Sequence, residues 1–217
     1  METKEIKLRR NRKGTPNSQL NQWESLPLNK MDGPFSLQQY IQQLIRKDPS
    51  DIEKIIELPE DQDKNLFIYE HLRQIIIDLH LFATFHNEVC TAEKQPIMKL
   101  TINGEQTCFL SGAFNPPREV SAIDYIAQTI EQTQDILNNS KLFPSRAYIP
   151  AESVGNFSTM FRRLYRIFAY SFFQHRELFD EFEKKYHLCE RFTALSQKFQ
   201  LMDPSLLWIP KDYFENL

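Results

Sequence analysis

The segment KNLFIYEHLRQIIIDLHLFATFHNEV, residues 64–89, decides the fold class. Its apolar residues recur at the i, i+3, i+4, i+7 spacing, which places them along one side of an α-helix. The segment therefore predicts a long helix with one buried face. The buried stripe should consist of Ile68, Leu72, Ile75, Ile76, Leu79, Phe82, Ala83 and His86.

Further helices are predicted on both sides of this segment. Helical periodicity indicates them, and Ser36 and Ser121 are placed where a serine hydroxyl can cap the free N–H groups of a helix start. The chain has only 5 glycines, and this scarcity favours packed helices over a loop-rich β fold. The predicted helical regions span residues 36–48, 50–58, 121–139, 151–187, 189–200 and 203–207.

One segment changes its period from helix to strand. Leu100 and Ile102 alternate with polar neighbours, and Asn103-Gly104 follows them. An Asn-Gly pair accommodates the two positive φ angles of a type I′ turn. A β-hairpin is therefore predicted over about residues 97–110.

The chain divides into an arm, a domain and a tail. Residues 1–34 begin with clustered basic side chains, and we interpret them as an extended basic N-terminal arm, with a solvated tail as the alternative. Residues 35–210 form the helical domain and residues 211–217 a C-terminal tail. The predicted fold class is all-α: a helical bundle with a small attached β-hairpin and the extended arm. An apolar anchor made of Trp23, Leu26 and Leu28 should attach the arm to the helical domain.

Composition and charge argue against several classes of protein. The net charge of -3 over 217 residues argues against a dedicated nucleic-acid binder, whose domain is usually basic. No apolar run approaches the ~20 residues that a membrane-spanning helix needs, and the first residues lack the apolar stretch of a secretory signal. Three cysteines at scattered positions give no disulfide framework. These features predict a soluble intracellular protein.

No combination of residues predicts catalysis. The sequence lacks a glycine-rich phosphate loop, a G-x-S-x-G turn and an H-E-x-x-H zinc motif. The cysteines have no matched base, and a free cysteine is more often part of a core. His71 and His187 are flanked by charged residues, so we expect both at the surface. The protein is therefore predicted not to be an enzyme.

A compact group of arginines marks the segment FRRLYRIFAYSFFQHRELF, residues 161–179. On an ideal helix, Arg162, Arg163 and Arg166 lie opposite the apolar stripe and within about 100° of one another. Such a cluster is either a solvated helix face or a binding site for an anion such as a phosphate group. The residues alone leave both interpretations open.

Six segments carry a family resemblance: LRRNRKGT (8–15), QQYIQQLIRKDPSDIEKIIELPEDQD (38–63), YEHLRQ (69–74), AIDYIAQTI (122–130), KLFPSR (141–146) and RRLYRIF (162–168). In this order, and without large insertions, they resemble the Mob family of kinase-binding adaptors and its phocein branch (class IV Mobs) in particular. The resemblance covers nearly the whole chain. It implies an all-α bundle with a small hairpin, in agreement with the elements predicted above.

The resemblance also implies a function. Mob proteins are non-catalytic adaptors, and members that recognise autophosphorylated germinal-centre Ste20-like kinases use basic residues in the helix that matches residues 161–169 here. The corresponding phosphate site is Arg162, Arg163 and Arg166. The phocein branch further implies a striatin-type scaffold as a partner and protein phosphatase 2A as an indirect one. It also implies a cytoplasmic protein that can associate peripherally with endomembranes.

Two alternatives stay open. A coactivator of nuclear Dbf2-related kinases belongs to the same class of protein. A binder of nucleic acid or anionic membranes, acting through the basic arm and the arginine helix, belongs to a different class. Binding by charge alone weakens steeply with salt, whereas an adaptor discriminates a phosphopeptide from its unphosphorylated twin.

The sequence departs from the family at a structural zinc site. Most Mobs bind zinc with two cysteines five apart and two histidines five apart. Here Cys90 and His175 match one member of each pair, but Gln95 and Tyr170 occupy the partner positions. Structural zinc is almost always four-coordinate, with Cys, His or carboxylate ligands, so we expect no zinc and no other cofactor. His86, one turn before Cys90, is the residue that could supply a third ligand.

Overall fold

The computed structural model describes residues 13–20, 24–102 and 104–215. Within these residues helices dominate, and one two-stranded antiparallel sheet accompanies them. The predicted all-α bundle with a small attached hairpin is therefore confirmed. None of the described helices is both long and apolar enough to cross a membrane.

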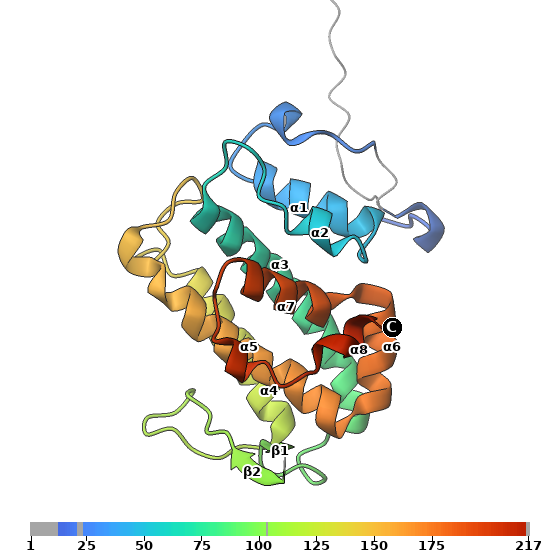
Figure 1. Ribbon diagram of the computed structural model, residues 1–217, viewed down its shortest axis with the longest axis vertical. Helices are drawn as coiled ribbons and strands as arrows, with labels where there is room; N and C mark the ends of the chain where they lie inside the picture. Colours follow the sequence, from blue (N-terminus) through green and yellow to red (C-terminus); the bar gives the residue numbers. More distant parts are fainter. Residues whose placement is uncertain (1–12, 21–23, 103, 216–217) are drawn as a thin grey trace, which may run out of the picture.

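The elements up to residue 198 follow one another in the predicted order. The α-helices are α1 (Ser36–Lys47), α2 (Ile52–Ile55), α3 (Lys64–Val89), α4 (Ala122–Leu137), α5 (Gly155–Gln174), α6 (Arg176–Tyr186), α7 (Leu188–Lys198) and α8 (Lys211–Glu215). The strands are β1 (Lys99–Ile102) and β2 (Glu105–Cys108), and four 3-10 turns span Asn17–Gln19, Leu28–Lys30, Ala151–Ser153 and Pro204–Leu206. In Figure 1, α3 crosses the centre of the molecule, with α1 and α2 over one end and the hairpin at the other.

Several helical regions differ from the prediction: the region predicted over 203–207 is the 3-10 turn Pro204–Leu206, and α8 lies in the predicted C-terminal tail. The region predicted over 151–187 is two helices, because His175 (φ -135°, ψ 56°) leaves the helical conformation between α5 and α6. The helix predicted over 50–58 is the single turn α2, and the Asp51 side chain caps its start. The break at His175 turns the chain, so that α6 leaves the end of α5 in a new direction along the side of the bundle (Figure 1).

The two serine caps have different outcomes. Ser121 caps α4 as predicted, because its hydroxyl oxygen accepts a hydrogen bond from Asp124 N at 3.2 Å. Ser36 does not cap α1: it is already helical, and Phe35 before it makes no side-chain cap. The Ser36 N–H is instead satisfied by the Gly33 carbonyl at 3.2 Å. A backbone turn therefore replaces the side-chain cap at the start of α1.

Aromatic rings from several helices meet around α3. The predicted stripe residues of α3 are buried, apart from Ala83, which is half-buried. The Phe82 ring centroid lies 4.6 Å from that of Phe182 on α6 and 6.0 Å from that of Phe168 on α5. Buried aromatic side chains contribute large apolar areas and prefer defined ring geometries. One ring of α3 therefore helps to fix both α5 and α6.

The hairpin packs on the bundle through one face. Ile102 pairs with Glu105 at its end, and Leu100 is buried while its neighbours along β1 are exposed, as the alternation predicts. Gly104 has φ +84°, a left-handed conformation that glycine adopts without steric penalty. Asn103 lies outside the described residues, so the type of the turn stays a prediction.

The described part of the arm lies against α1. Gln43 on α1 accepts a hydrogen bond from Leu26 N at 2.9 Å and donates one to Leu26 O at 2.6 Å. Leu28 is half-buried against the core. Of the predicted anchor, Leu26 and Leu28 therefore contact the domain, whereas Trp23 and the basic residues up to Arg12 lie outside the described residues.

Charged side chains lie inside the bundle. Glu70 on α3 pairs with Arg146, and Asp78, two turns further along α3, pairs with Arg191 at 2.5 Å. His71 is fully buried, so its predicted surface position is wrong. One of the charges that flank it in the sequence, Glu70, is itself buried in the bundle. Burial lowers the pKa of His71 to about 3, so the imidazole is neutral.

Glu183 on α6 makes the stability of the fold depend on pH. Its fully buried carboxylate accepts hydrogen bonds from Cys189 N at 2.9 Å and Glu190 N at 2.7 Å, at the start of α7. Burial nevertheless raises the pKa of Glu183 to about 7. The folded state therefore binds this proton more tightly than the unfolded chain, whose glutamates titrate near about 4.3. The resulting stabilisation is present below the unfolded pKa and is lost as pH rises through about 7.

We expect the Glu183→Gln variant to lose this pH dependence. Between pH 5 and pH 7.5 the carboxylate should lower the free energy of unfolding by about 2–3 kcal/mol, and urea denaturation at both pH values measures it. Gln keeps one acceptor oxygen and does not titrate. Glu181→Gln, an exposed carboxylate on the same helix, is the matched control and should keep the wild-type slope. An unchanged slope in Glu183→Gln would contradict the prediction.

Candidate functional site

The predicted arginines lie on α5, but only one of them is exposed. Helix α5 buries Phe161, Leu164 and the other apolar residues of its stripe, as periodicity predicts. On the other side, Arg162 is exposed, whereas Arg163 and Arg166 are half-buried. A fully solvated arginine face is therefore excluded, because α4 and the hairpin region cover part of it.

Arg163 turns toward α4. Its Nη1 donates a hydrogen bond to Gln132 Oε1 at 3.3 Å. On the other side, a Cβ atom built on Gly112 would lie 3.2 Å from Arg163 Nη2. The absence of a side chain at Gly112 therefore gives the guanidinium room between α4 and the loop after the hairpin.

Arg166 is held by two aromatic side chains. Its Nη1 donates to the Tyr125 hydroxyl at 3.0 Å, and its guanidinium carbon lies 4.8 Å from the Phe109 ring centroid. Such cation–π contacts stabilise an arginine without neutralising its charge. Among the described residues, the one hydrogen-bond partner of Arg162 is Thr159 Oγ1, at the long distance of 3.5 Å. Arg162 is therefore the freest of the three guanidinium groups, and Arg166 is the most fixed.

Arg162 and Arg166 line one pocket of about 220 Å³, and Arg163 does not line it. The structure therefore brings two of the three predicted residues together and directs the third toward α4. Apart from Tyr165 on α5, the rest of the lining comes from the hairpin region and from the chain after α7, so periodicity along α5 could not identify it. The remaining lining residues are Thr107, Phe109, Tyr165, Met202, Leu206 and Trp208.

The arginine surface is electrostatically unpaired. Within the described parts of the chain, no carboxylate forms an ion pair with Arg162, Arg163 or Arg166. Their hydrogen-bond partners are an amide and two hydroxyl groups, which are neutral. Guanidinium groups bind phosphate and carboxylate through parallel N–H···O bonds. The uncompensated charge of this surface therefore suits an anionic ligand.

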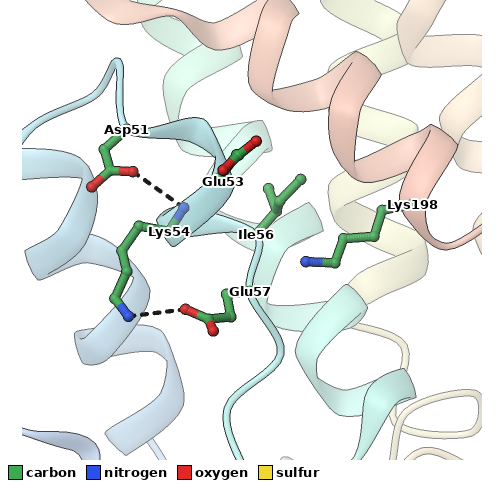
Figure 2. A pocket seen from close by; sticks show the side chains of 6 residues that line it. All are labelled: Asp51, Glu53, Lys54, Ile56, Glu57 and Lys198. Carbon is green, nitrogen blue, oxygen red and sulfur yellow. Dashed lines mark hydrogen bonds and ion pairs between the residues drawn. The ribbon is translucent and has the colours of Figure 1, made fainter.

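A larger pocket, of about 590 Å³, lies between α2 and the end of α7 (Figure 2). Lys54 Nζ lies 2.9 Å from Glu57 Oε2, so the two charges at its edge already neutralise each other. Asp51 uses its carboxylate to cap α2, and Lys198 projects into the space from α7. The pocket mixes both signs of charge on exposed side chains, so it gives no directed site for one ligand.

The positions of the family's zinc site form a hydrogen-bonded junction between α3 and the α5–α6 corner. The Tyr170 hydroxyl lies 3.4 Å from Cys90 Sγ and 3.3 Å from His175 Nε2. His86 Nδ1 donates to the Phe82 carbonyl at 3.0 Å, and the His86 ring meets the His175 ring edge-on, with centroids 5.9 Å apart. Tyr170 therefore occupies the middle of this cluster.

The chemistry of these donors does not fit a structural zinc. Burial raises the pKa of both the Cys90 thiol and the Tyr170 phenol, whereas a zinc ligand must be deprotonated. His86 Nε2 is buried without a hydrogen-bond partner, and His86, Cys90 and His175 would supply three ligands at most. Within the described residues, no group of three or more His, Cys, Asp or Glu side chains is arranged to hold a metal ion.

We predict that the purified protein holds no stoichiometric zinc. A structural zinc contributes roughly 10 kcal/mol or more to folding, so its removal by a chelator would lower the melting temperature steeply. Because this protein is predicted to hold no zinc, a chelator should leave its melting temperature unchanged. Elemental analysis of protein prepared without a histidine tag tests the prediction. The Gln95→Cys/Tyr170→His double variant restores four ligands and should acquire zinc and sensitivity to a chelator. About one zinc per wild-type chain would contradict the prediction and point to His86 as the extra ligand.

Comparison with known proteins identifies the family. The sequence profile of the Mob1/phocein family matches residues 42–209, which include every helix from α2 to α7 and the arginine surface. The chain therefore belongs to the Mob1/phocein family.

Within this family the chain is similar to relatives from animals and yeast. It is 42% identical to MOB kinase activator-like 4 of Drosophila melanogaster, over 96% of this chain and 92% of that protein. It is also 42% identical to MOB-like protein phocein of Caenorhabditis elegans, over 94% of this chain and 90% of that protein. Maintenance of ploidy protein mob1 of Schizosaccharomyces pombe is 27% identical, over 78% and 82% of the two chains.

Proposed function

We propose that this protein is a non-catalytic signalling adaptor. In this proposal its α5 arginines bind a phosphorylated germinal-centre Ste20-like kinase, and another surface binds a striatin-type scaffold. Protein phosphatase 2A is then an indirect partner within the same cytoplasmic complex. Membership of the Mob1/phocein family and the similarity to a phocein relative support the adaptor class.

The unpaired charge of Arg162, Arg163 and Arg166 is the observation that carries the kinase-binding part of the proposal. A phosphorylated side chain brings roughly -1.5 to -2 charges and three acceptor oxygens. Arg162 and Arg166 line one pocket and can share such a group, while Arg163 adds positive charge from the α4 side. Because Arg166 is already fixed by Tyr125 and Phe109, little conformational entropy is lost when it binds.

The pocket beside the arginines supplies a place for a second ligand side chain. Phe109, Met202 and Trp208 give it an apolar lining next to Arg162 and Arg166. A peptide whose phosphate is held by these guanidinium groups can place a neighbouring apolar side chain there. Phosphate provides the charge recognition, and this pocket provides sequence preference.

Affinity purification of the full chain followed by mass spectrometry tests the assignment of partners. Recovery of striatin and phosphatase subunits together with a Ste20-like kinase supports it. Recovery of nuclear Dbf2-related kinases without striatin would replace it with the coactivator alternative, and recovery of none of these would reject the adaptor assignment.

A second measurement separates the adaptor from a charge-only binder. Binding of a phosphopeptide and of its unphosphorylated twin is compared over a series of salt concentrations. An adaptor discriminates the two peptides at every salt concentration, whereas a nucleic-acid or membrane binder loses affinity for all anionic ligands together as salt rises.

A further inference from the structure

A pocket of about 190 Å³ lies in the groove between α3 and α4, outside the arginine surface and the zinc-site positions. Its apolar part is formed by Ile76 and Leu137, which are buried, and by Ile77, which is half exposed. An apolar cavity of about 150 Å³ accommodates benzene. The groove therefore has room for one apolar side chain of a partner.

Two hydrogen bonds between the helices hold the groove in shape. At one end, Arg73 Nη1 on α3 donates to Asn138 Oδ1, just after α4, at 2.9 Å. At the other end, His80 Nε2 donates to Gln134 Oε1 on α4 at 3.0 Å. Because α3 and α4 are tied at both ends of the pocket, the site exists before a ligand arrives, and less ordering is needed on binding.

Two exposed apolar side chains lie one turn apart on α3, and the first of them lines the pocket. Ile77 is 50% exposed and Leu81, one turn further along α3, is 40% exposed. Exposed apolar side chains grouped beside a pocket mark interaction surfaces more often than isolated ones do. Their spacing of four residues matches the repeat with which a helix presents its side chains. The edge of the groove is thus suited to pack against a second helix.

The positive charge of Arg73 predicts an acidic residue on that helix. Arg73 Nη1 donates to the Tyr69 hydroxyl and to Asn138, whereas Arg73 Nε is buried and has no hydrogen-bond partner among the described residues. Its charge also acts on the buried Glu70 carboxylate, which Arg146 binds directly, and within the described residues no carboxylate lies at ion-pair distance from it. A carboxylate brought by a partner would pair directly with this guanidinium at the end of the groove.

We propose that the α3–α4 groove is a docking site for an amphipathic helix of another protein. One apolar side chain of that helix fills the pocket beside Ile77, and an aspartate or glutamate near it pairs with Arg73. Binding of an amphipathic helix in a groove, through anchors about one turn apart, is a general mode of protein recognition. The proposal does not rest on the phosphate-binding role of α5.

Helix α4 separates this groove from the arginine surface. Gln134 and Leu137 face α3, while Gln132 and Tyr125 contact the α5 arginines. The two sites therefore have no lining residue in common, and substitutions in one can be tested against binding at the other. An adaptor with both sites can hold a helix and a phosphopeptide on opposite sides of one helix.

The test uses helix-forming peptides selected by phage display on the full chain. We expect the selected peptides to share two apolar residues three or four positions apart and an acidic residue beside them. Ile77→Asp should lower the affinity for the best peptide by about ten-fold or more. Val89→Asp, on the same helix but outside the pocket, is the matched control and should bind like the wild type. The peptide with its acidic residue changed to Gln should also bind about ten-fold more weakly.

Controls on the protein make the result decisive. Thermal melting of Ile77→Asp should match the wild type, because the side chain is half exposed, and the Gln peptide tests Arg73 without altering the protein. The proposal is overturned if no helical peptide is selected, if binding survives Ile77→Asp or if the acidic residue is dispensable. It is also overturned if Arg162→Ala abolishes binding, which would place the peptide at the arginine surface. Sedimentation that shows a dimer dissociated by Ile77→Asp would assign the groove to a second copy of this chain instead.

Discussion

Replacement of Arg162, Arg163 and Arg166 together by alanine should abolish measurable binding of a phosphopeptide from an autophosphorylated Ste20-like kinase. Hydrogen bonds that involve charged groups contribute roughly 1.5–3 kcal/mol each. Loss of one guanidinium therefore weakens binding by about ten-fold or more, and loss of three removes it from the range of a calorimetric titration. The unphosphorylated twin should bind weakly to the wild type and the variant alike.

Single variants separate recognition from stability. Arg162→Ala should lower the affinity for the phosphopeptide by about ten-fold. Because the Arg162 side chain is exposed, the free energy of unfolding should change by no more than about 0.5 kcal/mol. Arg166→Ala should lower both affinity and stability, since it also loses the Tyr125 hydrogen bond and the Phe109 contact. Arg176→Ala on α6 makes the same change in net charge outside the surface and should keep wild-type affinity.

Unchanged phosphopeptide affinity in the triple variant would remove the arginine surface from the proposed function. A triple variant that melts far below the Arg176→Ala control would show instead that these arginines are structural. Melting curves therefore accompany every titration, and Arg162→Ala gives the cleanest single comparison.

Loss of the Glu70–Arg146 pair should produce the largest fall in stability. Arg146 donates from Nε to Glu70 Oε1 at 2.8 Å and from Nη2 to Glu70 Oε2, and Nη2 also donates to Gln38 Oε1 at 3.2 Å. The Glu70 side chain is 1% exposed. Arg146→Ala leaves this carboxylate buried without its partner, which should cost about 3–5 kcal/mol. Urea denaturation measures the free energy of unfolding.

Two comparisons isolate the buried charge as the cause. Lys54→Ala breaks the exposed Lys54–Glu57 pair and should leave the free energy of unfolding nearly unchanged, because solvent screens exposed pairs. The Glu70→Met/Arg146→Met double variant removes both charges and should recover most of the stability lost in Arg146→Ala, because replacing a whole buried pair by apolar residues is often neutral. A loss below 1 kcal/mol in Arg146→Ala, or no recovery in the double variant, would contradict this account.

Local sequence patterns predicted the helices and strands well, but they predicted the tertiary contacts and exposure of the side chains poorly. The bounds of α3 follow from its apolar repeat, and Ser121 caps α4 because an N-cap depends only on residues three positions apart. The break at His175 carries no such signal, since neither glycine nor proline accompanies it. The contacts of His175 are the ring contact to His86 on α3 and the hydrogen bond to Tyr170 on α5, and the first of these depends on the tertiary fold.

The errors about exposure have a common physical origin. Charged neighbours placed His71 at the surface, but one of them, Glu70, finds a partner 76 positions away in Arg146. A helical wheel likewise groups Arg163 and Arg166 on one side of α5, and it does not show that α4 and the hairpin cover that side. Periodicity identifies the residues that share a face of a helix, while the contacts made by that face depend on the whole fold.

The Gln43 side chain attaches the N-terminal arm through backbone groups, so the attachment does not depend on the side chain at position 26. It bonds to the N–H and C=O of Leu26, groups that nearly every amino acid provides, in the manner of a neighbouring β-strand. Residue 26 can therefore be exchanged without loss of these two bonds, proline excepted. The path of the arm is thus set by Gln43 on α1 and not by the residues of the arm. We therefore expect another segment fused ahead of α1 to follow the same path.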